Sequence, residues 1–415
     1  MRIKKLVVSL LAAGIAVSPL AHATNGDTMM AVGSQNTALG GTGVAHFVGA
    51  ESTFANPAML GKSRGAEVAG GLTIFDPTVT NTGFSGATAV QSTAKTSFIP
   101  DVSYSDRISN NLSYGIAMAG IAGMGVDYVS APVNLYVAAK TTMSILKIVP
   151  TIAYNADNYG IGFSPVLQYG SLAISYVNAG GAYNPTHAAS TDTALGFTLG
   201  GYYDVSPAAT VGVSYNSPIK ATYGTQLSGA GDGFGQGTTS PGTSRFGDQL
   251  EQPAEIKIGF SMAATDSVTL TADYRQIQWG SAAGYKAFGW KDQDVLSIGA
   301  KFSGNGYWAG IGYNSANNPI VPYNNGAPLT PAGQNGGIVN FFNNMMFPAT
   351  IKDAFTFGGG YTMNKNLDLE GSVMIAPRVT TRVDVSDAMR MAPGSFFNTT
   401  THKQTSVSVS LRYKF

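Results

Sequence analysis

Apolar and polar residues alternate with a period of two through most of the chain beyond residue 65. Between residues 267 and 275 one face carries only apolar side chains or alanine: Val268, Leu270, Ala272 and Tyr274. The last segment has apolar residues at every second position up to the end of the chain: Val407, Val409, Leu411, Tyr413 and Phe415. Because successive side chains of a strand point to opposite faces, this pattern predicts strands with one apolar and one polar face.

The predicted strands are joined alternately by short and long connections. Short polar turns fall near residues 106–111, 155–158, 204–207, 265–267, 303–306 and 364–366. Long connections fall near residues 77–94, 127–139, 178–190, 224–249, 280–292, 315–350 and 381–401. An even number of strands with turns at one rim and long loops at the other is typical of bacterial outer-membrane barrels, so we expect an all-β, antiparallel transmembrane barrel of about fourteen strands over residues 66–415.

The first residues have the pattern of a secretory signal peptide. Arg2, Lys4 and Lys5 precede an apolar run over residues 6–20, and an Ala-His-Ala sequence ends at Ala23. The run is shorter than the roughly 20 residues that a membrane-spanning helix requires. We therefore expect residues 1–23 to be removed, the mature chain to begin at Thr24, and the protein to reach the bacterial outer membrane.

Residues 24–65 differ from the strand region. They are rich in Gly, Ala, Ser and Thr and show no sustained period. A barrel of this size has a lumen too wide to be filled by its own strand side chains alone and narrower than that of the open porins. The segment is therefore predicted to be a hatch inside the lumen.

Composition agrees with a lipid-facing surface and excludes several function classes. Only 11% of the residues are charged, with a net charge of +1, whereas soluble domains have about 25% charged residues. The scattered basic residues make nucleic acid an unexpected partner. We find no metal, nucleotide or nucleophile motif, so no cofactor is expected and an outer-membrane lipase or protease is the less favoured alternative. An adhesin is the third alternative.

Several tracts together resemble the FadL family of outer-membrane channels for long-chain fatty acids and toluene-type compounds. They are Ala38-Leu39-Gly40-Gly41, Phe54-Ala55-Asn56-Pro57-Ala58, Phe75-Asp76-Pro77 and the tract over residues 285–292. The resemblance covers the mature chain and implies a fourteen-stranded barrel with an N-terminal hatch that includes Asn56 and Pro57. It also implies passive uptake of hydrophobic molecules, with long-chain fatty acids as the first expectation and neutral hydrocarbons as the alternative.

The resemblance further implies a lateral gate and a ligand pocket. In the family the third strand bends inward, and the matching stretch here contains Gly120, Gly123 and Gly125. The alternative is that these glycines only reduce the side-chain volume in a tightly packed barrel wall. Lys286 falls on the family's pocket lysine, which pairs with a carboxylate, although a solvated loop lysine is the alternative. The family's arginine on the fifth strand has no counterpart in residues 169–177, which weakens the case for an anionic ligand.

Apolar residues suggest further contacts with the ligand. Met29 and Met30 are predicted either to reach the pocket or to serve in packing, since methionine adapts to varied apolar ligands. Phe341, Phe342 and Phe347 lie in a predicted external loop and form either an exposed binding patch or a loop core. The remaining expected partners are outer-membrane lipid, lipopolysaccharide and the barrel-assembly machinery, which reads the terminal Phe415. We expect a monomer.

Overall fold

The computed structural model describes residues 25–83, 89–129, 139–177, 183–184, 188–233, 246–323, 336–386 and 391–415. The predicted signal peptide and Thr24 lie outside these residues. None of the helices in the described part of the chain has the length and hydropathy needed to cross a bilayer.

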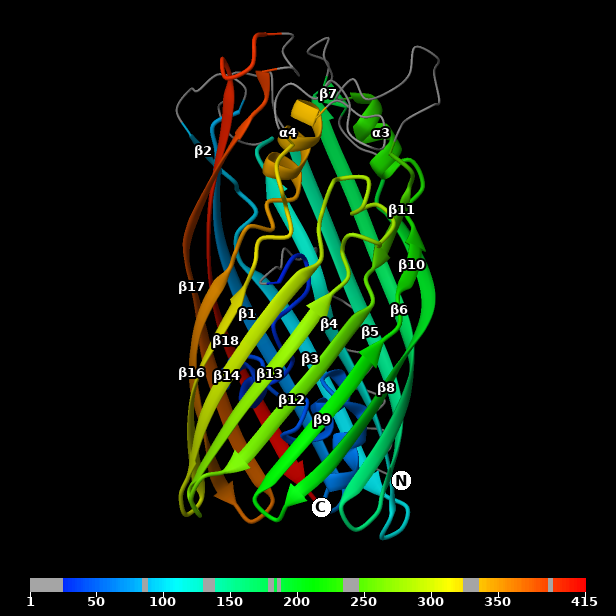
Figure 1. The fold of residues 1–415 in the computed structure, drawn as a ribbon, viewed down its shortest axis with the longest axis vertical. Helices are drawn as coiled ribbons and strands as arrows, with labels where there is room; N and C mark the ends of the chain where they lie inside the picture. The colour runs from blue at the N-terminus through cyan, green and yellow to red at the C-terminus, as the bar shows by residue number, and fades with distance from the viewer. Residues whose placement is uncertain are drawn as a thin grey trace.

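The strands form one antiparallel sheet that closes on itself (Figure 1). The sheet has 16 strands, of which β2 (Val90–Gln91) and β7 (Tyr183–Asn184) have two residues each, so fourteen strands build the wall. Closure comes from β1 and β18, which pair from Glu67 with Lys414 to Asn81 with Thr400. The wall strands are β1 Glu67–Asn81, β3 Ser97–Arg107, β4 Leu112–Asp127, β5 Ala139–Asn155, β6 Tyr159–Val177, β8 Ser190–Ser206, β9 Ala209–Asn216, β12 Glu255–Ala263, β13 Val268–Ile277, β14 Gln293–Ser303, β15 Tyr307–Ala316, β16 Asp353–Asn364, β17 Leu367–Asp384 and β18 Phe397–Lys414. The predicted barrel is confirmed.

The alternation predicted from the sequence sets the two faces of the wall. In β18, Val407, Val409 and Leu411 are 41%, 51% and 49% exposed on the outside. The serines between them are buried toward the lumen. Apolar side chains that face outward suit a lipid surround, because transmembrane barrels carry an apolar outer band.

The connections divide between the two rims as expected. The C-terminus and the short turns lie at one end, and the long connections lie at the other (Figure 1). Helices α3 (Gln226–Gly233) and α4 (Gly336–Met346) and the hairpin of β10 (Ile219–Thr222) with β11 (Gln249–Gln252) belong to these long connections. The long-loop end is therefore the external end by the rule for bacterial barrels.

Residues 25–62, here called the N-terminal segment, contact strands on all sides of the barrel. The segment contains α2 (Ser34–Ala38) and two 3₁₀ helices, η1 (Ala50–Phe54) and η2 (Pro57–Lys62). Hydrogen bonds tie it to opposite parts of the wall: Ser34 to Ser410, Thr42 to Thr271, and Asn56 to Gly201. It lies inside the outline of the barrel in Figure 1.

Glycines of the wall make room for this segment. A side chain at Gly312 would overlap the backbone of Leu39 and Gly40, and one at Gly212 would overlap that of Val44. Gly40 itself has a φ of 74°, which favours glycine. Close approach of backbone to backbone therefore explains both the Gly-rich signature and part of the glycine content of the strands.

Candidate functional site

Aromatic side chains from the long connections fill the external half of the lumen. Trp279, Tyr285 and Trp290 have ring centroids 4.5 to 5.1 Å apart. Phe288 stacks on Phe347 with centroids 5.7 Å apart. These side chains are 0% or 1% exposed. Together with Phe341 and Phe342 we call them the aromatic core.

The phenylalanines predicted from the sequence belong to this core and not to an exposed patch. Phe341 and Phe342 lie on α4, Phe347 follows it, and all three are 0% exposed. The expectation of an exposed apolar patch is therefore wrong, and the alternative of a loop core is correct. Ten of the eleven residues of α4 are buried, so the helix is enclosed on nearly all sides, as expected of a helix that lies within a core.

Asparagines fix α4 in this position. Asn343 donates to the carbonyl of Phe288 at 2.7 Å and accepts from the indole of Trp290 at 2.9 Å. Asn344 donates to the side chain of Asn398 on β18 at 2.6 Å. Buried amides that are paired in this way orient the helix, since an unpaired amide in an apolar core is costly.

A cavity of about 100 Å³ lies next to the aromatic core and the N-terminal segment. We call it the central cavity. Val295 belongs to the apolar cluster of the aromatic core and also lines the cavity. Met29 and Met30 line it as well, so the structure places both predicted methionines at the cavity. Their contact with a ligand stays a prediction.

Charged side chains from three strands face the central cavity. Glu255 of β12 lies 3.1 Å from Lys257 and 3.9 Å from Arg275 of β13. Asp273 accepts hydrogen bonds from the amides of Gly43 and Val44. In the described part of the chain these acids are thus engaged by protein donors.

Lys147 of β5 also lines this cavity and differs from the other charged residues there in its polar contacts. It lies on the same face of β5 as Ile145 and Val149, both of which are buried. Its ammonium has no hydrogen bond and no ion pair within 4.0 Å among the described residues, although it lines the cavity. Glu255, which lines the same cavity, and Asp27 are the acids whose charges act on Lys147, but neither forms an ion pair with it within 4.0 Å.

The pairing of β3 with β4 covers only part of the two strands. The two strands pair from Arg107 with Ser113 to Asp101 with Ala119, and beyond this point the pairing stops. The register of β4 with β5 shifts between Gly120 and Ala122, which indicates a bulge. The three glycines predicted at the gate thus lie at and beyond the point where β4 leaves β3.

The N-terminal segment takes the place of β3 along the edge of β4. Met29 donates its amide to the carbonyl of Ile121 at 2.8 Å, and Gly123 donates its amide to the carbonyl of Asp27 at 2.9 Å. Thr28 forms a bridge with Ala122. Because Thr28, Met29 and Ile121 also line the central cavity, the cavity adjoins the place where the wall loses its pairing.

Lys286 is not at the central cavity. Its side chain is exposed, whereas Tyr285 and Phe288 on either side of it are buried. It is absent from the residues that line the cavity. The position of Lys286 favours the alternative of a solvated loop lysine. The sequence analysis missed Lys147, which could have been found as a lysine on the inward face of a predicted strand.

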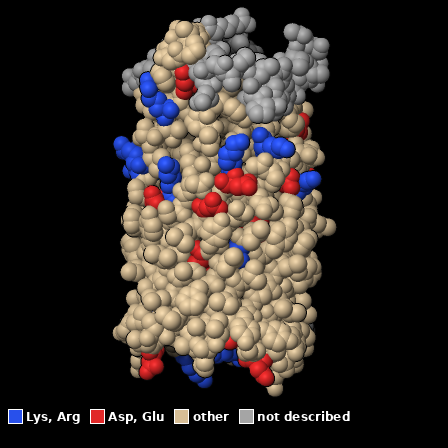
Figure 2. All heavy atoms as spheres, in the orientation of Figure 1, with Lys and Arg blue, Asp and Glu red and all other residues tan. Residues whose placement is uncertain are grey.

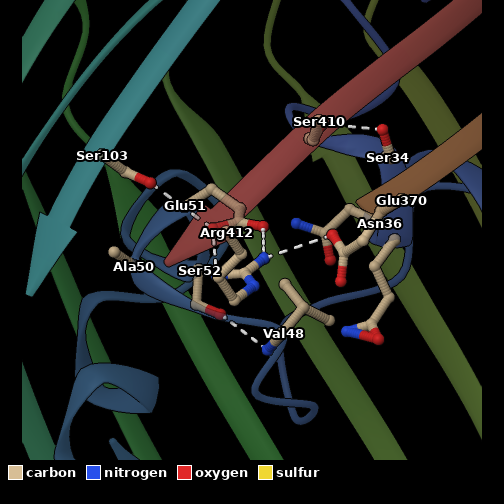
Figure 3. Close-up of polar contacts among 12 residues, drawn as sticks. Ser34, Asn36, Val48, Ala50, Glu51, Ser52, Ser103, Glu370, Ser410 and Arg412 are labelled. Atoms are coloured by element: carbon tan, nitrogen blue, oxygen red, sulfur yellow. Dashed lines mark hydrogen bonds and ion pairs between the residues drawn. The ribbon is translucent and has the colours of Figure 1, made fainter. Parts of the chain in front are cut away.

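An arginine on the last strand anchors the N-terminal segment from the other side (Figure 3). Arg412 approaches Glu51 of η1 at 2.5 Å, Glu67 of β1 at 2.9 Å and Glu370 of β17 at 3.4 Å. The side chain of Arg412 is 4% exposed. This buried cluster joins the segment to the seam where the barrel closes.

Asp27 is buried beneath the aromatic core. It accepts hydrogen bonds from the hydroxyl of Tyr285 and, at 3.4 Å, from the amide of Gln252. Burial raises the pKa of the Asp27 carboxyl from 3.8 to about 7, and the hydrogen bonds from Tyr285 and Gln252 only partly oppose the rise. The Asp27 carboxyl thus keeps its proton to a higher pH when the segment is docked than when it is exposed to water.

We expect docking of residues 27–29 on β4 to weaken as the pH rises. A carboxyl whose pKa is raised on folding contributes stability that is fully present below its ordinary value of 3.8 and is lost as the pH passes about 7. Hydrogen exchange of the Gly123 amide, corrected for the intrinsic rate, should therefore speed up as the pH rises from 3.8 to about 7 and level off above that pH. Asp27→Asn should remove the dependence, and a wild-type exchange profile that is flat in pH would contradict this account.

Comparison with known proteins agrees with this architecture. A sequence profile described as outer membrane protein transport protein (OMPP1/FadL/TodX) matches residues 12–415. The chain belongs to this family. The family consists of transporter channels for hydrophobic compounds, and together with the barrel fold it places the protein in the bacterial outer membrane. A search of curated proteins found no match.

Solved structures of the OMPP1/FadL/TodX family share the fold at low identity. A Pseudomonas aeruginosa FadL homologue has a TM-score of 0.68 and 14% identity, over 95% of this chain and 100% of its own. The Ralstonia pickettii toluene transporter TbuX has a TM-score of 0.61 and 17% identity, over 93% and 99%. The Pseudomonas putida toluene transporter TodX has a TM-score of 0.63 and 14% identity, over 96% and 99%.

Proposed function

We propose that the protein is a channel for passive uptake of long-chain fatty acids, which it releases sideways into the membrane between β3 and β4. The observation that carries the choice of a fatty acid is Lys147, whose ammonium lines the central cavity and has no ion pair within 4.0 Å among the described residues. A carboxylate would supply a counter-ion, and a charge-assisted hydrogen bond of this kind is among the stronger ones in proteins.

The driving force for capture is burial of the alkyl chain. Each CH₂ group that leaves water gains about 0.8 kcal/mol, so contact with apolar side chains of the lumen favours entry of a hydrophobic solute. The central cavity of about 100 Å³ is smaller than a typical ligand pocket. Met29 and Met30 line it, and flexible methionine side chains let such a site enlarge around an alkyl chain.

Lateral release rests on the gap between β3 and β4. The central cavity adjoins the edge of β4 at Ile121, and the side chains of the outer wall beside it are apolar. A ligand that leaves here passes directly into lipid and does not enter water. The N-terminal segment, which crosses the lumen, acts in this proposal as the hatch that closes the direct route.

A neutral hydrocarbon is the second candidate. The structural relatives TbuX and TodX are described as toluene transporters, and the aromatic core offers apolar contacts that do not require a charge on the ligand. Uptake of labelled oleate and of toluene in a strain that lacks its own transporter separates the candidates. Toluene uptake without oleate uptake would establish the second.

The variant Lys147→Met tests the carboxylate contact. It keeps the length of the side chain and removes the charge, so oleate uptake should fall by about tenfold to a hundredfold, the equivalent of a lost hydrogen bond to a charged group. Toluene uptake should not change. Lys286→Met is the matched control, because this lysine is exposed and should leave both rates unaltered. Undiminished oleate uptake by Lys147→Met would exclude the contact.

A further inference from the structure

Charged side chains on the outside of the barrel gather toward the long-loop end. Figure 2 shows basic and acidic side chains in a belt below the loops and again at the opposite rim, with a broad band of other residues between them. Outward-facing Lys or Arg costs about 2 to 4 kcal/mol at the middle of a bilayer and close to nothing at its interfaces. The belt therefore lies at the level of the outer-leaflet headgroups.

One part of this belt is a row of basic residues on neighbouring strands. Phe355 pairs with Ile375, and Lys352 and Arg378 both lie three residues further toward the long-loop rim. Lys403 on β18 lies between the pairs that join Ala376 to Gln404 and Val379 to His402, so it is next to Arg378. Neighbouring strands are about 4.8 Å apart, which places these three charges within about 10 Å of one another.

A fourth base extends the row beyond β1. Lys403 pairs with Thr78, and Lys95 precedes β3 by two residues, which sets it level with Pro77. Lys95, Lys352, Arg378 and Lys403 are all exposed. Within the described chain none of their side chains has a hydrogen bond or ion pair. Two acids lie on this face among the described residues: Asp76, which accepts a hydrogen bond from Thr96, and Asp353, which accepts hydrogen bonds from Tyr313 and Ser315.

An apolar wall lies directly below the row. The outward side chains of the same strands toward the short-turn rim are large and exposed: Leu72, Ile74, Phe98, Phe355, Phe357, Ile375, Val407, Val409 and Leu411. A ligand that fits this surface has anionic groups spaced over about 10 to 20 Å at the top and several alkyl chains beneath.

We propose that this surface, formed by Lys352, Arg378 and Lys403 with Lys95 at its edge, binds the phosphorylated diglucosamine headgroup of lipopolysaccharide. Lys and Arg are the usual protein donors to phosphate oxygens, and guanidinium binds them in a bidentate manner. The phosphates contact the row, and the acyl chains lie along the apolar wall. A phospholipid with one phosphate engages only part of the row. The surface is separate from the uptake path, which lies in the lumen.

Binding of a defined lipid tests the proposal. The full protein in phosphatidylcholine nanodiscs is titrated with fluorescent bis-phosphorylated lipid A. We expect the triple variant Lys352→Gln, Arg378→Gln, Lys403→Gln to bind it at least about tenfold more weakly, since each basic residue near a membrane surface adds appreciably to anionic lipid binding. The matched control is Lys140→Gln, Lys220→Gln, Lys291→Gln, which removes three exposed bases that lie outside the row.

Three results would overturn the proposal. They are equal binding by the row variant and wild type, an equal loss in the control variant, and equal binding of dephosphorylated lipid A. Competition by phosphatidylglycerol as strong as that by lipid A would also overturn the choice of lipid. Each single substitution is measured in parallel, so a folding defect in the triple variant does not hide the result. Oleate uptake by the row variant should match wild type, which keeps this test independent of the proposed transport.

Discussion

Replacing Arg412 with alanine is expected to lower the free energy of unfolding by about 3 to 5 kcal/mol, the usual effect of removing one partner from a buried ion cluster. Its guanidinium contacts Glu51, Glu67 and Glu370, and these carboxylates would remain buried without a cation (Figure 3). Because Glu51 lies on η1 and Glu67 on β1, the loss should loosen both the N-terminal segment and the closing seam. Equilibrium unfolding in lipid vesicles with a chemical denaturant measures the change.

Lys414 provides the matched control on the same strand. It pairs with Asp368 at 2.5 Å, but its side chain is 50% exposed. An exposed ion pair contributes about 0 to 1 kcal/mol, so Lys414→Ala should have a small effect. Combining Arg412→Ala with Glu51→Gln and Glu370→Gln should restore part of the stability, because the uncompensated charge is then reduced. Equal losses in Arg412→Ala and Lys414→Ala would show that burial of the cluster is not the cause.

Gly123→Trp is expected to reduce uptake of every transported compound to the level of cells that lack the protein. Gly123 lies on the part of β4 that does not pair with β3, where lateral release is proposed. An indole there fills the opening, and the backbone bond from Gly123 to Asp27 can persist because it does not involve a side chain. Initial rates of oleate and toluene uptake, with equal amounts of folded protein in the membrane, measure the effect.

A tryptophan elsewhere in the wall controls for the bulk of the side chain. A Cβ atom added to Gly201 on β8 meets no atom closer than 3.7 Å, and Gly201 lies far from the gap along the sheet. Gly201→Trp should leave uptake unchanged. Normal flux through Gly123→Trp would exclude lateral release at β4, and blocked flux in both variants would point to a general defect of the barrel.

The sequence predicted the barrel because the signal for it is local. Alternation in β13 and β18 depends only on the geometry of a strand with one face in lipid, so Val407, Val409 and Leu411 already specify which face is outside. Turn residues fix the short connections in the same way. The tract around Asn56 was found through the resemblance, and the structure gives its reason: Asn56 caps η2 and bonds to Val44 and Gly201.

The loops were harder to interpret from the sequence. The sequence shows that Phe341 and Phe342 are apolar, but not whether they face solvent, a ligand or each other. Only the position of α4 over the lumen decides that they are buried. Lys286 matched a family position, yet its side chain is exposed beside the buried Tyr285. The same apolar residues are present whichever way a loop or a short helix is turned. Periodicity alone therefore does not determine which of its side chains faces the site.

The sequence by itself determined the strand faces, the alternation of turns and loops, and a non-periodic segment ahead of the barrel. Only the tertiary structure decided which inward residues meet. Lys147 lies more than a hundred residues before Glu255 and Arg275 in the sequence. The three side chains line one cavity because closure of the sheet places β5 across the lumen from β12 and β13. The end of the β3–β4 pairing and the register shift between β4 and β5 are likewise properties of neighbouring strands and not of one segment. Alternation within a strand shows to which face each side chain points. Closure and register depend on contacts between distant segments, and a local pattern does not specify those contacts.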